Sequence, residues 1–99
     1  MIDHEKRLPD IFVYTDLIDR FIENSITASE FESAFLRAIK QEQRILGNPV
    51  YPILQELFED TDAYVSDPSL RTEPEDLDDE QLRACARRAR QALRVVGYL

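Results

Sequence analysis

The chain has one cysteine, one histidine and two glycines, and each shortage excludes a class of chemistry. With Cys85 alone, no internal disulfide framework can form and a metal-binding cluster lacks its ligands. With His4 alone, a histidine general base or a histidine metal site is nearly excluded. The sequence also lacks a glycine-rich phosphate loop and a nucleophile with a nearby base. We therefore expect no enzyme, no metal and no cofactor.

Long apolar runs are missing as well. No run of apolar residues exceeds four, so no segment can cross a bilayer or form the apolar part of a secretory signal. At 43% hydrophobic and 32% charged residues, the chain is nevertheless too apolar to be wholly disordered. Its 99 residues are enough for one modest core. We expect a single helical domain over residues 1–99 that remains in the cytoplasm.

Apolar residues recur at helical spacing without sustained alternation, which predicts an all-α protein. The first predicted helix covers about residues 10–24. The second begins at Thr27, where Glu30 completes a capping box, and runs to about Leu46. Gly47 is placed to end this helix in a left-handed conformation.

Glu42 falls in the middle of the apolar face of the second predicted helix, close to Ile45, which we expect to be buried. An unpaired buried carboxylate is costly. We expect Glu42 to reach water near the helix end, and the alternative is an ion pair with a loop cation such as Arg71.

Two further helices complete the expected fold. The third is predicted from an N-cap at Asn48 to about Val65, and the fourth from a capping box of Asp78 and Gln81 to Gly97. Between them lies a connection of about twelve residues without periodicity, and loops of this length are often functional. Four helices with mostly short links predict a four-helix antiparallel up-and-down bundle.

The last predicted helix has two contrasting faces. Its apolar face includes Cys85, which we expect to be a buried small hydrophobe. Arginines line the opposite face, which we expect to be solvated and also able to pair with acids of a neighbouring helix. These are Arg83, Arg87, Arg90 and Arg94.

Charge is distributed in three blocks. Residues 1–55 carry nine acids and six bases, residues 56–80 carry eleven acids and one base, and residues 81–99 carry five bases and no acid. A concentrated acidic block repels nucleic acid and anionic membranes and speeds encounter with a positively charged protein. We therefore expect no direct binding to nucleic acid or membranes. A compact carboxylate cluster can instead occupy the phosphate sites of a basic nucleic-acid enzyme.

Four segments of the chain resemble the colicin D-type, or self-protective colicin-like, immunity proteins, which also protect against toxins of contact-dependent growth inhibition. The segments are residues 14–22, 26–36, 54–71 and 78–83. The most specific part is LF-x-D-x-D-x-Y followed by DP-x-LR. It consists here of Leu57, Phe58, Asp60, Asp62, Tyr64, Asp67, Pro68, Leu70 and Arg71.

The resemblance implies a four-helix bundle that binds the basic nuclease domain of a cognate toxin. In the colicin D case the toxin cleaves tRNA, and the acidic immunity protein covers its active site in the manner of phosphates. Carried onto this chain, the resemblance implies blocking carboxylates at Glu56, Glu59, Asp60 and Asp62. It implies rim or loop contacts at Asp67, Glu73, Glu75, Asp76 and Asp79. It also implies that the loop is held against the bundle by Tyr64, Pro68, Leu70 and Arg71.

Four other readings stay open. The acidic stretch can be only a solvated face of an oligomerisation or adaptor module, or the chain can mimic nucleic acid to sequester a regulator other than a toxin. The acids Asp78, Asp79 and Glu80 can simply complement the positive end of the last helix. An enzyme is the remaining alternative. Oligomeric state is not predicted.

Overall fold

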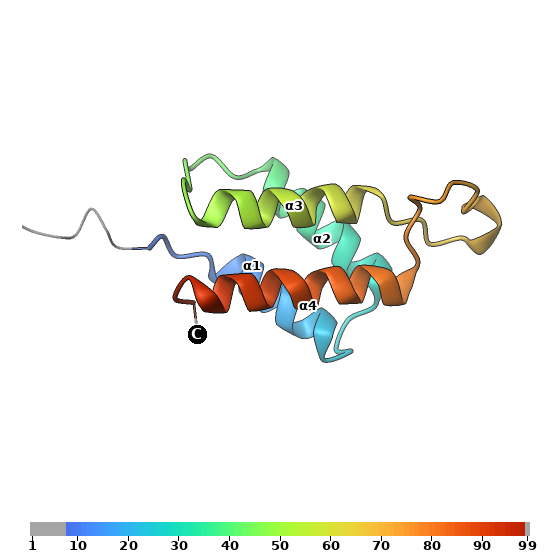
Figure 1. Ribbon diagram of the computed structural model, residues 1–99, viewed down its shortest axis with the longest axis horizontal. Helices are drawn as coiled ribbons and strands as arrows, with labels where there is room; N and C mark the ends of the chain where they lie inside the picture. Colours follow the sequence, from blue (N-terminus) through green and yellow to red (C-terminus); the bar gives the residue numbers. More distant parts are fainter. Residues whose placement is uncertain (1–7, 99) are drawn as a thin grey trace, which may run out of the picture.

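A computed structural model describes residues 8–98, in which four α-helices and a short 3₁₀ turn follow one another (Figure 1). The elements are α1 (Phe12–Ile22), α2 (Ala28–Lys40), α3 (Val50–Asp62), η2 (Pro68–Leu70) and α4 (Asp79–Val95). The described part of the chain contains no strand, so the expected all-α fold is confirmed. His4 lies outside the described residues.

The helices form a closed ring around one core. Each helix packs on the next along the chain, and α4 returns to pack on α1. In Figure 1, α3 and α4 lie side by side and run in opposite directions. The expected four-helix bundle is therefore confirmed. No helix within residues 8–98 is long and apolar enough to span a membrane.

Aromatic side chains of α1 and α2 form the centre of the core. Phe31 stacks on Phe21 and on Phe35, with ring centroids 4.7 and 5.3 Å apart, and Tyr14 meets Phe35 edge to face. Such pairs contribute about 0.5–1.5 kcal/mol each beyond their area burial. The facing side of α4 is built from small and aliphatic residues, which allow the helices to approach closely. These are Leu82, Cys85, Ala86, Ala89 and Leu93.

Both predicted capping boxes are present. The Glu30 amide donates to the Thr27 hydroxyl at 3.1 Å, and the Thr27 amide donates to the Glu30 carboxylate at 2.8 Å. The same reciprocal bonds join Asp78 and Gln81 at 2.8 and 2.9 Å. Each box satisfies two amides that a helix start leaves without partners.

The prediction for the end of the second helix was wrong. Helix α2 ends at Lys40, and Ile45 is 98% exposed instead of buried. Gly47 has the expected left-handed conformation, with φ of 67°, but it lies in the connection that precedes α3. The helix therefore ends before Ile45 and Leu46, whose spacing continues the apolar pattern.

The bonds of Glu42 are compatible only with this early ending. Its carboxylate accepts hydrogen bonds from the Arg44 guanidinium at 2.8 and 2.9 Å, from the Arg44 amide at 3.0 Å, and from the Tyr14 hydroxyl at 2.7 Å. Residues two apart do not face each other on a helix, so Arg44 reaches Glu42 only where the helix has ended. The expectation that Glu42 reaches water was wrong. Its partner is a loop cation, but this cation is Arg44 and not Arg71.

Helix α3 differs from its prediction at both ends. Pro49 occupies the N-cap position and no side chain caps the helix, so the assignment of Asn48 as the cap was wrong. The helix ends at Asp62, three residues before Val65. The connection that follows is closed at its base, because the Val65 amide donates to the Leu77 carbonyl and the Leu77 amide donates to the Ala63 carbonyl, both at 3.0 Å.

Candidate functional site

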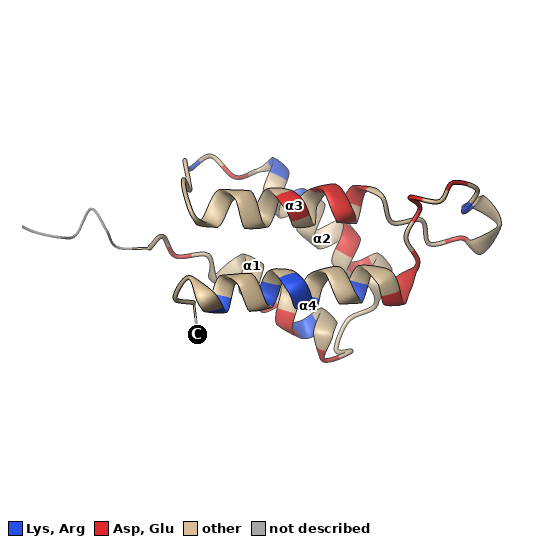
Figure 2. Ribbon diagram, in the orientation of Figure 1, with Lys and Arg blue, Asp and Glu red and all other residues tan. Residues whose placement is uncertain are grey.

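The last turns of α3 carry four carboxylates. Glu56, Glu59 and Asp62 are exposed, Asp60 is half-buried, and the last turn contains no basic residue. Figure 2 shows these acids along the end of α3 that approaches the long connection. The C-terminus of a helix carries a partial negative charge, so a carboxylate there costs about 0.3–1 kcal/mol. The arrangement is therefore unfavourable for the isolated chain and favourable for binding a cation.

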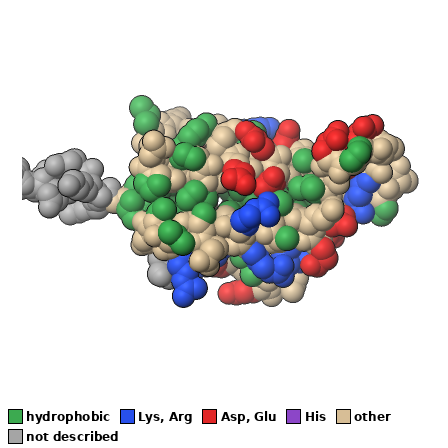
Figure 3. Space-filling view, viewed as in Figure 1, with side chains coloured by type: hydrophobic (Ala, Val, Ile, Leu, Met, Phe, Trp, Pro, Cys, Tyr) green, Lys and Arg blue, Asp and Glu red, His purple; other side chains and the backbone are tan. Residues whose placement is uncertain are grey.

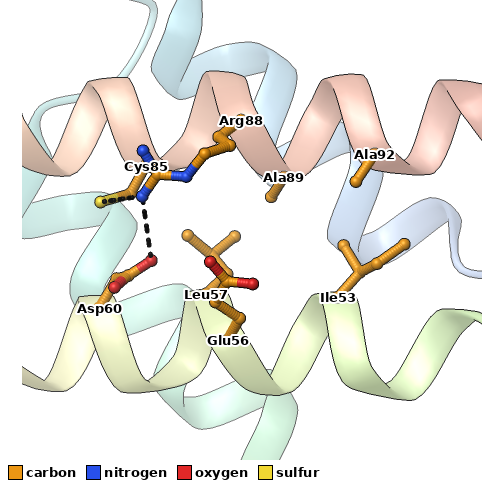
Figure 4. A pocket seen from close by; sticks show the side chains of 8 residues that line it. All are labelled: Ile53, Glu56, Leu57, Asp60, Cys85, Arg88, Ala89 and Ala92. Atoms are coloured by element: carbon orange, nitrogen blue, oxygen red, sulfur yellow. Dashed lines mark hydrogen bonds and ion pairs between the residues drawn. The ribbon is translucent and has the colours of Figure 1, made fainter.

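One edge of this acidic end faces α4. Asp60 and Glu56 border a small cavity of about 50 Å³ between α3 and α4, together with Arg88 and Cys85 (Figure 4). The Asp60 carboxylate lies 4.0 Å from the Arg88 guanidinium, which also donates to the Cys85 sulfur at 3.4 Å. Since the pair is long and the Arg88 side chain is 63% exposed, its contribution is about 0–1 kcal/mol. Sequence spacing within α3 could not reveal this cation, because it comes from another helix.

The single cysteine has the expected environment. Cys85 is buried between α3 and α4, and burial, together with the nearby Asp60 charge, raises the pKa of its thiol. A thiol with a raised pKa is mostly protonated and a poor nucleophile at neutral pH. The prediction of a buried small hydrophobe is confirmed.

The other edge of the acidic end faces α2. The pKa of Glu32 is raised, first by burial and then by the negative charge of Asp62. Glu32 therefore adds a carboxylate from a second helix beside the acidic end of α3. Sequence reasoning missed this residue because it lies outside the acidic block and occupies an ordinary polar position of α2.

Asp79 is held within the chain at the start of α4. Its carboxylate accepts a hydrogen bond from the Tyr64 hydroxyl at 2.7 Å, and the Arg71 guanidinium lies 3.8 Å away. Tyr64 is buried, which raises its pKa. Arg71 also donates to the Val65 carbonyl at 2.7 Å and to the Ser66 carbonyl at 3.2 Å. Tyr64 and Arg71 thus link the base of the long connection to α4.

The outer part of this connection is shaped by its own residues. Asp67 accepts two hydrogen bonds from Ser69, which lower the pKa of its carboxyl and begin η2. In the same way, Asp76 accepts from two amides of the connection, both at 3.0 Å. Pro68 and Leu70 are exposed in η2, so they add little packing against the bundle.

Two further acids of the connection have a different environment. Glu73 and Glu75 are exposed. They therefore lie in solvent beside the turn that Asp76 shapes.

The arginines of α4 are not one solvated stripe. Arg83 is buried, pairs with Glu80, and places its guanidinium 4.8 Å from the centre of the Phe21 ring. Arg90 donates to Asp19 of α1 at 2.6 Å, which confirms pairing with a neighbouring helix. Arg87 and Arg94 are exposed as expected. The prediction of a solvated face was wrong for Arg83, because the stripe curves under α1.

Nothing in the described range groups three or more side chains that could hold a metal ion. What the structure brings together is a carboxylate surface from two helices: Glu56, Glu59, Asp60 and Asp62 of α3 and Glu32 of α2. Asp79 is bonded to Tyr64 and is not part of it. We call these five residues the acidic surface. Fold and surface together define an acidic helical bundle.

The family comparison names the class. The chain belongs to the bacterial self-protective colicin-like immunity family, whose model matches residues 10–95. Membership in this family implies that the chain binds and neutralises a cognate toxin. Comparisons with curated proteins and with solved structures gave no match.

Proposed function

We propose that this chain neutralises a nuclease toxin by placing the carboxylates of its acidic surface in the basic groove that binds the toxin's RNA substrate. The observation that carries the proposal is the group of acids at the end of α3. They repel one another, three of them (Glu59, Asp60 and Asp62) lie in the last turn at the negative end of the helix, and that turn provides no basic residue to offset them. Such a cost is explained if a cationic partner relieves it on binding.

Binding would be stoichiometric and would turn over no substrate. Long-range attraction between the acidic surface and a basic groove would speed encounter, while a few close pairs would set the dissociation rate. Glu56 and Glu59 are exposed and available at once. Asp60 would exchange its weak contact with Arg88 for a shorter one with the toxin.

The finer identity of the toxin follows from the resemblance of residues 57–71 to colicin D-type immunity proteins. We infer a toxin that cleaves tRNA, delivered as a colicin or by contact-dependent growth inhibition. Carboxylates that take the places of RNA phosphates are the simplest way for an acidic protein to block such an enzyme. The encounter would take place in the cytoplasm, where tRNA is found.

The test is a titration of the basic nuclease domain encoded next to this gene, at low and at high salt, with tRNA cleavage measured in parallel. We expect tight binding that weakens with salt and abolishes cleavage. Tight binding without loss of cleavage would show that the acidic surface blocks something other than the RNA groove. Absence of binding would favour a different basic partner or an oligomerisation role.

A further inference from the structure

An apolar patch lies beside the acidic surface, where α3 begins. Ile45 is 98% exposed and Tyr51 is 51% exposed. Two open hollows of about 370 and 310 Å³ adjoin them, and both hollows are lined by Arg44, Leu46 and Tyr51. Figure 3 shows hydrophobic side chains gathered over the end of the molecule where α3 begins and α4 ends, while the acids lie over its middle and its opposite end. Contiguous exposed apolar surface of this kind marks interaction sites.

The exposure of Ile45 is imposed by the residues before it. Arg44 is fixed by Glu42 and also donates to the Asp10 carbonyl at 2.7 Å, while Leu46 is buried. Ile45 is therefore held between an anchored arginine and a buried leucine and cannot fold into the core. The backbone at Ile45 is thus anchored on both sides, so it loses little entropy when the side chain meets a partner.

A hydrogen-bonded ladder joins this patch to the acidic surface. The Tyr51 hydroxyl donates to the Gln55 side-chain oxygen at 3.0 Å, and the Gln55 side-chain nitrogen (Nε2) donates to the Glu59 carboxylate at 3.2 Å. These residues are four apart and lie on one side of α3. A partner whose cation meets Glu59 would therefore also cover Tyr51.

We propose that Ile45 and Tyr51 are the apolar anchor of the toxin-binding surface and receive an apolar side chain of the toxin that is flanked by lysine or arginine. This inference rests on the proposed function and adds to it a division of roles. The acids govern the rate of association and its dependence on salt. The anchor governs the rate of dissociation, because a few buried aromatic and aliphatic contacts carry most of the energy of an interface.

The experiment measures association and dissociation rates of the basic nuclease domain encoded next to this gene, at low and high salt. Ile45→Ala and Tyr51→Ala should each dissociate roughly tenfold faster or more, with association rates within roughly a factor of two of wild type. Both variants should keep the salt dependence of the wild type. Tyr51→Phe retains the ring and should dissociate at nearly the wild-type rate.

Val13→Ala is the matched control. Val13 is an apolar residue of α1 that is 58% exposed and lies outside both hollows, so its loss should leave both rates unchanged. Thermal unfolding should be unaffected in all four variants because the residues are on the surface.

Three outcomes would overturn the inference. If the wild type binds in a salt-dependent way but Ile45→Ala and Tyr51→Ala dissociate like it, the anchor is wrong and the proposed function stands. If the wild type does not bind the nuclease domain at all, the proposed function and the anchor fall together. If the wild type self-associates in sedimentation and the two variants lose only that property, the patch is an interface between copies of this chain.

Discussion

Two groups of carboxylates lie at the same end of the bundle, and their electrostatic environments are opposite (Figure 2). At the start of α4, Asp78 caps the helix, Asp79 accepts from Tyr64, and Glu80 pairs with Arg83. These acids meet the positive end of a helix and have partners within the chain, so they stabilise the fold.

The acids at the end of α3 meet the negative end of their helix instead. No basic residue occupies the last turn, and the cation that approaches within residues 8–98, Arg88, is 4.0 Å from Asp60. The difference supports the proposal that carboxylates of one sequence block stabilise the fold in one helix and serve recognition in the other. Their position along the helix dipole distinguishes the two groups.

The largest expected effect is on binding. Glu59→Lys combined with Asp60→Lys should weaken binding of the nuclease domain by well over the roughly 1–3 kcal/mol of one charged hydrogen bond, because two attractions become repulsions. Calorimetric titration would measure the loss, and circular dichroism should show an unchanged helix content.

A single-charge comparison provides the control for this variant. Glu23→Lys, exposed after the end of α1, changes the net charge as much as Glu59→Lys but lies outside the acidic surface. It should bind nearly as well as the wild type. Equal losses in both would show that only the overall charge matters and that the contrast between the two acidic groups has no functional meaning.

An acid bonded wholly within the chain should affect stability and not charge-driven binding. Glu42→Gln should lower the free energy of unfolding by about 1–3 kcal/mol at neutral pH, because it weakens the bonds from Arg44 and Tyr14. Urea denaturation would measure the change, with the exposed Glu23→Gln as control.

The effect of Glu42→Gln should depend on pH. The hydrogen bonds from Arg44, followed by that from Tyr14, lower the pKa of Glu42 to about 2. A carboxyl whose pKa is lower in the folded state stabilises the protein above the ordinary carboxyl pKa and loses this contribution as pH falls through the folded value. The gap between wild type and variant should therefore narrow towards pH 2. A constant gap would mean that Glu42 acts through packing and not through its charge.

The smallest expected effect tests the helix dipole with two variants that keep the side-chain shape. Asp62→Asn, at the end of α3, should raise the free energy of unfolding by about 0.3–1 kcal/mol. Asp79→Asn, at the start of α4, should lower it by at least as much, because it also weakens the hydrogen bond from Tyr64. Thermal denaturation of the pair would measure both signs. If both variants changed the free energy of unfolding in the same direction, the helix dipole would not distinguish the acids of α3 from those of α4.

The sequence could predict the features that depend on neighbouring residues. The starts of α2 and α4 were predicted because a capping box joins residues three apart. The acidic block was also visible, because its residues are close together in the sequence. The all-α fold followed from the spacing of apolar residues along each helix.

The tertiary structure alone decided the pairs that join distant parts of the chain. Glu42 meets Tyr14 across 28 residues and Arg90 meets Asp19 across 71, and no local pattern indicates either pair. The bonds of Glu42 require that α2 has already ended, and Ile45 lies in water, against the helical spacing that placed it in the core. Arg83, which the sequence placed on the surface, is likewise buried against Phe21 of α1. Charge and periodicity are properties of the chain, but the pairing of charges depends on which helix lies beside which.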